Sequence, residues 1–161
     1  MKEKSVCFTG HRVIPKDDYY RVMFLLRQNV EKKIKEGYTD FYAGGALGFD
    51  TLAALTVLRM KMSYKKVKLH LILPCENQAE KWRGEDRRMY EKILKESDSV
   101  TYISKQYTPQ CMNRRNRALV DSASYCMAYC TQATGGTAYT IGYAMDCGVE
   151  VENIAHEVMS M

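Results

Sequence analysis

The chain has 161 residues, 46% of them hydrophobic and 27% charged, and its formal net charge is +5. This balance excludes an intrinsically disordered chain, and the length suits one domain with a sizeable core, which we place at residues 1–161. The surplus of positive charge favours anionic partners weakly and identifies none of them.

The sequence carries no recognisable secretion or membrane signal. Its first apolar run, residues 5–8, is too short for a signal peptide or a membrane span. The six cysteines include no pair with the CxxC spacing of a zinc or redox site. Cys126 and Cys130 fall on one face of a predicted strand, where small core residues are a simpler interpretation than metal ligands. We therefore expect a cytoplasmic protein with no membrane partner, no metal site and no required cofactor.

Short apolar runs alternate along the chain with longer segments of helical periodicity. Strands are predicted at residues 5–9, 40–43, 69–73, 100–103, 125–130 and 149–154. Helices are predicted from about residues 17–18 to 36, then at 48–60, 79–95, 108–122 and 137–146. Pro74 is expected to close the third strand, and Thr108 and Pro109 to open the fourth helix as a hydroxyl cap followed by proline. Trp82 is expected on the inward face of the third helix.

Regular strand–helix alternation with apolar strands indicates an α/β fold. We predict a single Rossmann-like domain with a mostly parallel sheet and helices on both faces. In such folds ligands bind beyond the C-terminal ends of the strands, where the strand order reverses. The residues that follow the strands are therefore the candidates for a site.

Three predicted strand ends carry residues suited to holding an anion. Glycines allow close approach of the backbone, and free N–H groups at a helix start attract phosphate. The candidate ligand-binding residues are Thr9, Gly10, His11, Arg12, Gly44, Gly45, Ala46, Asp50, Arg115, Asn116, Gly135, Gly136 and Thr137. We expect Gly10, Gly44, Gly45, Gly135 and Gly136 to cluster at one edge of the sheet.

Two of these residues have alternative roles. Asp50 opens an otherwise apolar helix, where it either caps the N-terminus as a favourable charge or acts as a catalytic carboxylate. Thr137 either donates its hydroxyl to a phosphate oxygen or caps its helix. On the helix before the fifth strand, Arg114 and Arg115 lie about 100° apart and cannot both face inward. The face that Arg115 shares with Met112, Asn116 and Leu119 is the better candidate for the pocket, while Arg117 is expected in solvent.

These motifs together resemble the SLOG superfamily, which joins the DprA/Smf proteins with the LOG phosphoribohydrolases. Residues 43–53, A-G-G-A-L-G-F-D-T-L-A, are close to the DprA pattern S-G-x-A-x-G-I-D-x-x-A. Residues 5–12, S-V-C-F-T-G-H-R, match the first strand and turn of the short YpsA-like branch. Pro74, Gln78, Trp82, Tyr107 and residues 111–116 resemble that branch specifically.

The resemblance implies a Rossmann-like fold and a pocket for nucleotides or their derivatives, related to NAD or ADP-ribose. LOG enzymes carry R-K-x-x-M on one helix and P-G-G-x-G-T-x-x-E on the next. Here residues 115–119 read R-N-R-A-L, so the arginine is kept and the lysine is not. Thr140 stands where the second motif has glutamate, and a threonine cannot stabilise an oxocarbenium-like charge or activate water as a carboxylate does.

Three functions follow as hypotheses. The first is binding or sensing of a phosphate-bearing, nucleotide-derived small molecule. The second is hydrolysis of a nucleotide glycosidic or phosphate bond, with Asp50 as the carboxylate. The third is DprA-like binding of single-stranded DNA by the basic segment 81–95, which has few aromatic residues for base stacking. The sequence leaves formation of a homo-oligomer open.

Overall fold

A computed structural model of the protein describes residues 2–161. The strands are β1 (Ser5–Gly10), β2 (Asp40–Ala43), β3 (Lys68–Cys75), β4 (Ser99–Ser104), β5 (Tyr125–Tyr129) and β6 (Glu150–Asn153). The helices are α1 (Tyr19–Lys35), α2 (Phe49–Lys61), α3 (Gly84–Glu96), α4 (Cys111–Asp121), α5 (Gly136–Asp146) and α6 (Ala155–Met159). Two short 3-10 turns, η1 (Lys2–Lys4) and η2 (Lys16–Asp18), precede β1 and α1.

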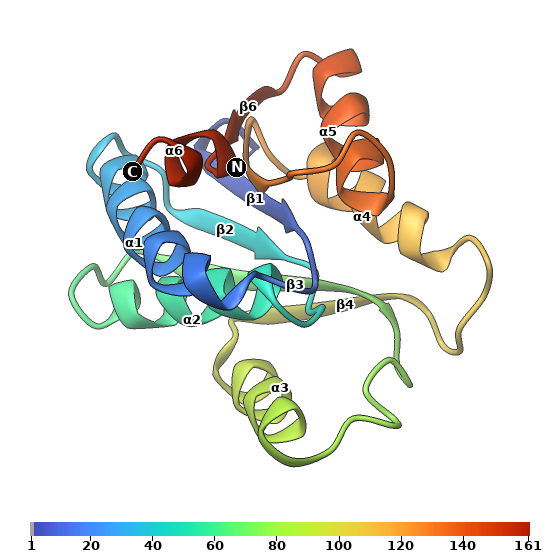
Figure 1. The fold of residues 1–161 in the computed structure, drawn as a ribbon. Coiled ribbons are helices and arrows are strands. Elements are labelled where there is room, and N and C mark those ends of the chain that lie inside the picture. The colour runs from blue at the N-terminus through green and yellow to red at the C-terminus, as the bar shows by residue number, and fades with distance from the viewer. Residues whose placement is uncertain (1) are drawn as a thin grey trace.

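All six strands form one parallel sheet in the order β4-β3-β2-β1-β5-β6 (Figure 1). The chain builds the sheet outward from β1 to β4, then crosses back so that β5 pairs with the free side of β1. The strand order therefore reverses between β1 and β5, where the crevice of a Rossmann-like sheet opens. The predicted α/β class and parallel sheet are confirmed.

Helices cover both faces of the sheet. One hydrophobic cluster packs α1, α2, α3 and α6 against one face, and it contains the fully buried Phe8, Phe41 and Leu71. A smaller cluster packs α4 and α5 against the opposite face around Cys7 and Cys126, which are neighbours across β1 and β5. The strands bury side chains on both faces, which is why they read as continuous apolar runs in the sequence.

Two predicted helix starts are wrong. The third helix begins at Gly84 and not at residue 79, because residues 76–81 form turns and Trp82, which follows them, packs at the edge of the core. The fourth begins at Cys111, and Thr108 provides no side-chain cap; its backbone oxygen accepts from the Cys111 amide at 3.2 Å. In both places the sequence pattern predicts the helix start too early, because the first predicted residues form a turn before the helix begins.

One predicted strand end differs as well, and one helix was not predicted. β3 continues through Pro74 to Cys75, because β2 has already ended there and the proline interrupts no ladder on that side. The short helix α6 follows β6 and buries Ala155 and Val158. Within residues 2–161, no helix has the length and apolar character needed to cross a membrane.

Candidate functional site: a pocket where the strand order reverses

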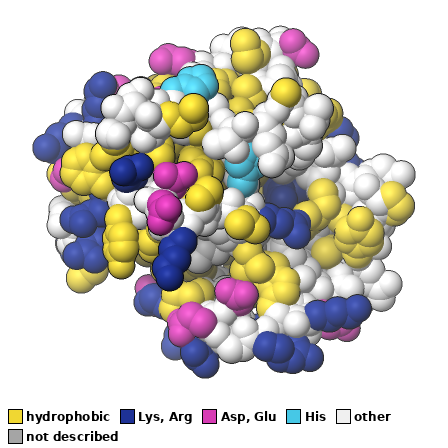
Figure 2. Space-filling model, in the orientation of Figure 1, with side chains coloured by type: hydrophobic (Ala, Val, Ile, Leu, Met, Phe, Trp, Pro, Cys, Tyr) yellow, Lys and Arg dark blue, Asp and Glu magenta, His cyan; other side chains and the backbone are white. Residues whose placement is uncertain are grey.

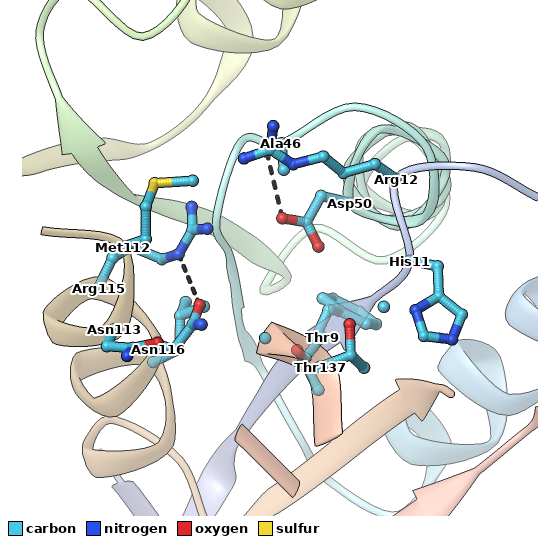
Figure 3. A pocket seen from close by; sticks show the side chains of 14 residues that line it. Thr9, His11, Arg12, Ala46, Asp50, Met112, Asn113, Arg115, Asn116 and Thr137 are labelled. Carbon is cyan, nitrogen blue, oxygen red and sulfur yellow. Dashed lines mark hydrogen bonds between the residues drawn. The ribbon is translucent and has the colours of Figure 1, made fainter. Parts of the chain in front are cut away.

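A pocket of about 270 Å³ opens at the C-terminal end of β1, between α4 and the loops that precede α2 and α5 (Figure 3). It lies where the reversal of strand order predicts a ligand site. The space-filling view shows a hollow near the centre of this face, with basic and histidine side chains at its rim (Figure 2). Its lining residues are Phe8, Thr9, Gly10, His11, Arg12, Ala46, Asp50, Met112, Asn113, Arg115, Asn116, Leu119, Gly136 and Thr137.

The end of β1 supplies the floor of the pocket. Gly10 is packed so closely against α2 that an added Cβ would lie 2.4 Å from the Phe49 ring. His11 fastens this loop to the neighbouring one, because its Nε2 accepts the Thr131 amide at 2.8 Å. Partial burial lowers the pKa of His11, which agrees with a neutral ring that accepts at Nε2. His11 therefore holds the loop in place, and Arg12 provides the positive charge.

The loop between β2 and α2 is shaped by glycines whose neighbours leave no room for a side chain. Gly48 precedes α2 with φ +77°, and an added Cβ would lie 2.2 Å from the Arg12 backbone oxygen. The backbone oxygen of Gly44 accepts from Arg115 Nη1, and that of Gly45 accepts from Gln78 Nε2 at 3.1 Å. The carbonyls of Gly44 and Gly45 are thus used to fix the loop.

Asp50 stands in the first turn of α2 with only 5% of its surface exposed. Its Oδ2 accepts the Ala46 amide at 3.2 Å, which closes the loop onto the helix start. Burial raises the pKa of the Asp50 carboxyl above its usual value of 3.8, while Arg115, the Ala46 amide and Arg12 act in the opposite direction. A carboxyl with a raised pKa beside a cavity is suited to holding or transferring a proton.

The first turns of α4 place Arg115 and Asn116 in the wall of the pocket, and Figure 3 shows both on the side opposite Asp50 and Arg12. Arg115 is 5% exposed, and its Nε donates to Asn116 Oδ1 at 2.8 Å. The predicted inward face of α4, with Met112, Arg115, Asn116 and Leu119, is the face that lines the pocket. Arg117, which was expected in solvent, is partly exposed and donates to the Tyr139 hydroxyl at 2.8 Å.

Arg115 is a buried cation without a direct counterion. No Asp or Glu oxygen in residues 2–161 lies within 4.0 Å of its nitrogens; Asp50 is near enough to interact only at longer range. Burial lowers the pKa of Arg115, an effect that the Asp50 charge partly offsets. A guanidinium carries five N–H donors, and only two of the donors of Arg115 reach acceptors in the described chain. The pocket therefore presents a desolvated positive group.

The start of α5 closes the remaining side. Gly136 and Thr137 line the pocket, whereas Gly135, with φ +102°, forms the turn just outside it. Thr140, which stands at the LOG glutamate position, is fully buried and donates its hydroxyl to the Gly136 oxygen at 2.8 Å. The Thr140 hydroxyl therefore makes its hydrogen bond within α5.

The fold thus brings most of the predicted site residues together. Gly10 and Gly136 meet in one cavity, so the single-site arrangement holds, while Gly44, Gly45 and Gly135 support its rim without lining it. Asn113 lines the pocket and was not among the predicted site residues; it lies one turn before Asn116, which is the signal that would have found it.

A parallel six-stranded sheet with a pocket at its strand reversal defines the Rossmann-like class of α/β proteins. The profile described as the YspA SLOG family matches residues 14–158, and the chain belongs to that family. A UPF0398 protein of Bacillus thuringiensis (strain Al Hakam) is 28% identical over 160 residues, covering 93% of this chain and 86% of that protein. UPF0398 protein BCB4264_A1614 of Bacillus cereus (strain B4264) is 28% identical over 123 residues, covering 74% and 66%.

Solved structures with the same fold include two DNA processing A proteins (DprA). The one from Streptococcus pneumoniae superposes with a TM-score of 0.66 at 18% identity over 91% of this chain, which spans about half of that protein (48%). The one from Helicobacter pylori gives a TM-score of 0.66 at 14% identity, covering 97% of this chain and 71% of that protein. Both likenesses bear on the fold alone.

Proposed function

We propose that the pocket binds the phosphate group of a nucleotide-derived small molecule, and that the protein acts as a binding or sensing domain. The observation that carries this proposal is Arg115, a guanidinium that is 5% exposed and has no carboxylate within 4.0 Å in the described chain. Burying a charge is costly unless a partner compensates it. A phosphate, which matches the planar donor fork of arginine, would supply that partner.

Other features of the pocket support an anionic ligand. The first N–H groups of α5 at Gly136 and Thr137 have no acceptor within their helix and carry the positive end of its dipole. Arg12 adds a second cation at the opposite rim, and the Thr9 and Thr137 side chains offer hydroxyl donors. The volume of about 270 Å³ lies just below the ~300–1,000 Å³ common for ligand pockets. A ribose phosphate portion suits this size better than a whole dinucleotide.

Calorimetric titration with AMP, ADP-ribose and adenosine tests this proposal. AMP and ADP-ribose are expected to bind and adenosine, which lacks phosphate, to bind far more weakly. Arg115→Ala should weaken AMP binding by about 1.5–3 kcal/mol, the scale of a charge-assisted hydrogen bond. Arg114→Ala is the matched control, because Arg114 is the exposed neighbour on the same helix and its loss changes the net charge equally. Equal affinities of the two variants for AMP would contradict the proposal.

Asp50 favours a second candidate function, hydrolysis of a nucleotide glycosidic or phosphate bond. Its carboxyl lines the same pocket and has a raised pKa, as a general acid or base requires. Product chromatography with AMP and ADP-ribose distinguishes the two functions. Turnover by the wild type that disappears in Asp50→Asn, with ligand binding retained, would replace binding by catalysis as the function.

DNA binding is a weaker candidate on the charges of the described surface. DNA processing protein A of Helicobacter pylori has a single-stranded DNA binding mode. In this chain α3, which holds most of the predicted basic segment, carries four basic and four acidic residues, so only Lys81 and Arg83 before the helix add unbalanced positive charge. Ion pairs join Arg88 to Glu85 at 2.8 Å and Lys92 to Glu96 at 2.6 Å. On the face shown in Figure 2, basic and acidic side chains are interspersed.

A further inference from the structure

The strand β4 is an open edge of the sheet. It stands last in the strand order, and in residues 2–161 it pairs only with β3. The Asp98 amide donates to the Leu69 oxygen at 2.7 Å, so the backbone groups of even-numbered residues point toward β3. Alternation along a strand then turns the N–H and C=O groups of Ser99, Thr101 and Ile103 outward.

The two edges of the sheet differ in their protection against pairing. β6, at the other end, has four residues and carries Glu150 and Glu152. β4 has six residues, S-V-T-Y-I-S, without a charge or a proline. Its Val100 and Tyr102 side chains are 36% and 41% exposed. Sheet edges that remain unpaired are commonly shortened, charged or interrupted by proline, and β4 shows none of these features.

We propose that β4 pairs antiparallel with β4 of a second copy of this chain, about a two-fold axis that passes at Thr101. The result is a homodimer in which one sheet runs through both subunits. A self-complementary strand is the natural element for such an interface, because a two-fold axis places the same patch on both partners.

The register follows from the alternation. Outward-facing residues must oppose outward-facing residues, so the axis must pass at a residue and not between two. An axis at Thr101 sets Val100 opposite Tyr102 twice, and a β-branched side chain opposite an aromatic one is a favourable cross-strand pair. An axis at Tyr102 would instead leave Val100 opposite Ser104. Antiparallel pairing also places the Asp98 end of one β4 strand beside the Lys105 end of the other. Opposite charges, and not like charges, therefore lie near each other at both ends of the strand pair.

One strand pair buries less than the ~1,200 Å² of total surface typical of stable interfaces, so the dimer is expected to be weak and reversible. Sedimentation velocity over a wide concentration range should show a monomer–dimer equilibrium for the wild type. A monomer at every concentration would overturn the proposal.

Substitutions at position 101 test the register, because the two-fold axis places the Thr101 side chains of the two subunits opposite each other. Thr101→Lys and Thr101→Glu should each be monomeric, since two like charges would meet. An equimolar mixture of the two variants should recover the dimer. Circular dichroism checks that both variants fold, and Gln132→Lys, an exposed loop substitution after β5, is the control for an added lysine. A Thr101→Lys protein that dimerises as the wild type does, or a mixture that stays monomeric, would overturn this interface.

Discussion

At the scale of single residues, the pocket holds two buried charges of opposite sign that do not pair directly. Arg115 and Asp50 are each 5% exposed and influence one another at a distance across the space above Gly44. An added Cβ at Gly44 would lie 2.7 Å from Arg115 Nη1 and 3.0 Å from Asp50 Oδ2, so glycine is what leaves this space open. The guanidinium is therefore not paired directly with the Asp50 carboxylate.

The raised pKa of Asp50 predicts a pH dependence with a definite sign. The folded state binds the Asp50 proton more tightly than the unfolded chain does, where the pKa is near 3.8. The stabilisation from this group is therefore complete below that value and is lost as pH rises through the higher folded-state pKa. An ionised Asp50 also repels phosphate, so AMP affinity should fall over the same range.

Asp50→Asn should flatten both trends, because its amide can still accept from Ala46 but does not titrate. Denaturant unfolding and AMP calorimetry at a series of pH values measure the two effects. Comparing the variant with the wild type cancels the titration of the phosphate itself. A stability difference, wild type minus Asp50→Asn, that grows as pH rises would contradict the assignment.

At the scale of elements, the end of β1 and the start of α2 are packed without space between them. The Phe49 amide donates to the His11 oxygen at 3.0 Å, and the Phe49 ring stacks on Tyr129 with centroids 6.0 Å apart. Gly10 lies directly against that ring. This contact fixes how far the first loop stands from the second, and therefore the width of the pocket.

Gly10→Ala should destabilise the protein by about 1–3 kcal/mol, the usual cost of overpacking a core. The added methyl group would meet Phe49 ring atoms at 2.4 Å, and these are not the end of a flexible side chain. Gly142→Ala is the matched control: it lies within α5, where nothing stands within 4 Å of an added Cβ. That change should stabilise by roughly 0.5–1 kcal/mol. Urea unfolding of both variants tests the contrast, and an equal effect of the two would refute the close packing.

At the scale of the whole molecule, the net charge of +5 is not gathered on α3, because its basic residues are matched in number by acidic ones and several of them form ion pairs. Surface pairs of this kind contribute little to stability, about 0–1 kcal/mol each, but they remove charge that a nucleic acid would need. The two arginines of the pocket, Arg12 and Arg115, share a cavity of about 270 Å³ with Asp50.

Single-stranded oligonucleotides should therefore bind weakly, with an affinity that falls steeply as salt rises. Fluorescence anisotropy with a labelled oligothymidine at several salt concentrations measures this dependence. Arg88→Ala, which removes one paired cation of α3, should change the affinity little. Tight binding that survives physiological salt would place DNA among the ligands of this protein.

The sequence by itself determined the class of fold, because apolar periodicity is encoded within a few neighbouring residues. Alternating strands and helices implied a parallel sheet, and a parallel sheet gathers the ends of its strands at one edge. That is why Thr9, Arg12, Asp50 and Thr137 could be assigned to one site before the structure was known. The inward face of α4 followed in the same way from helical geometry.

Only the tertiary structure decided what each of these groups does. The carbonyls of Gly44 and Gly45 are taken by Arg115 and Gln78, and His11 accepts from Thr131. Each of these contacts joins residues far apart in the sequence, so no local pattern encodes it. The same reason explains the wrong helix start at residue 79: propensity allowed a helix there, and packing of Trp82 against Tyr90, with ring centroids 5.1 Å apart, selected a turn.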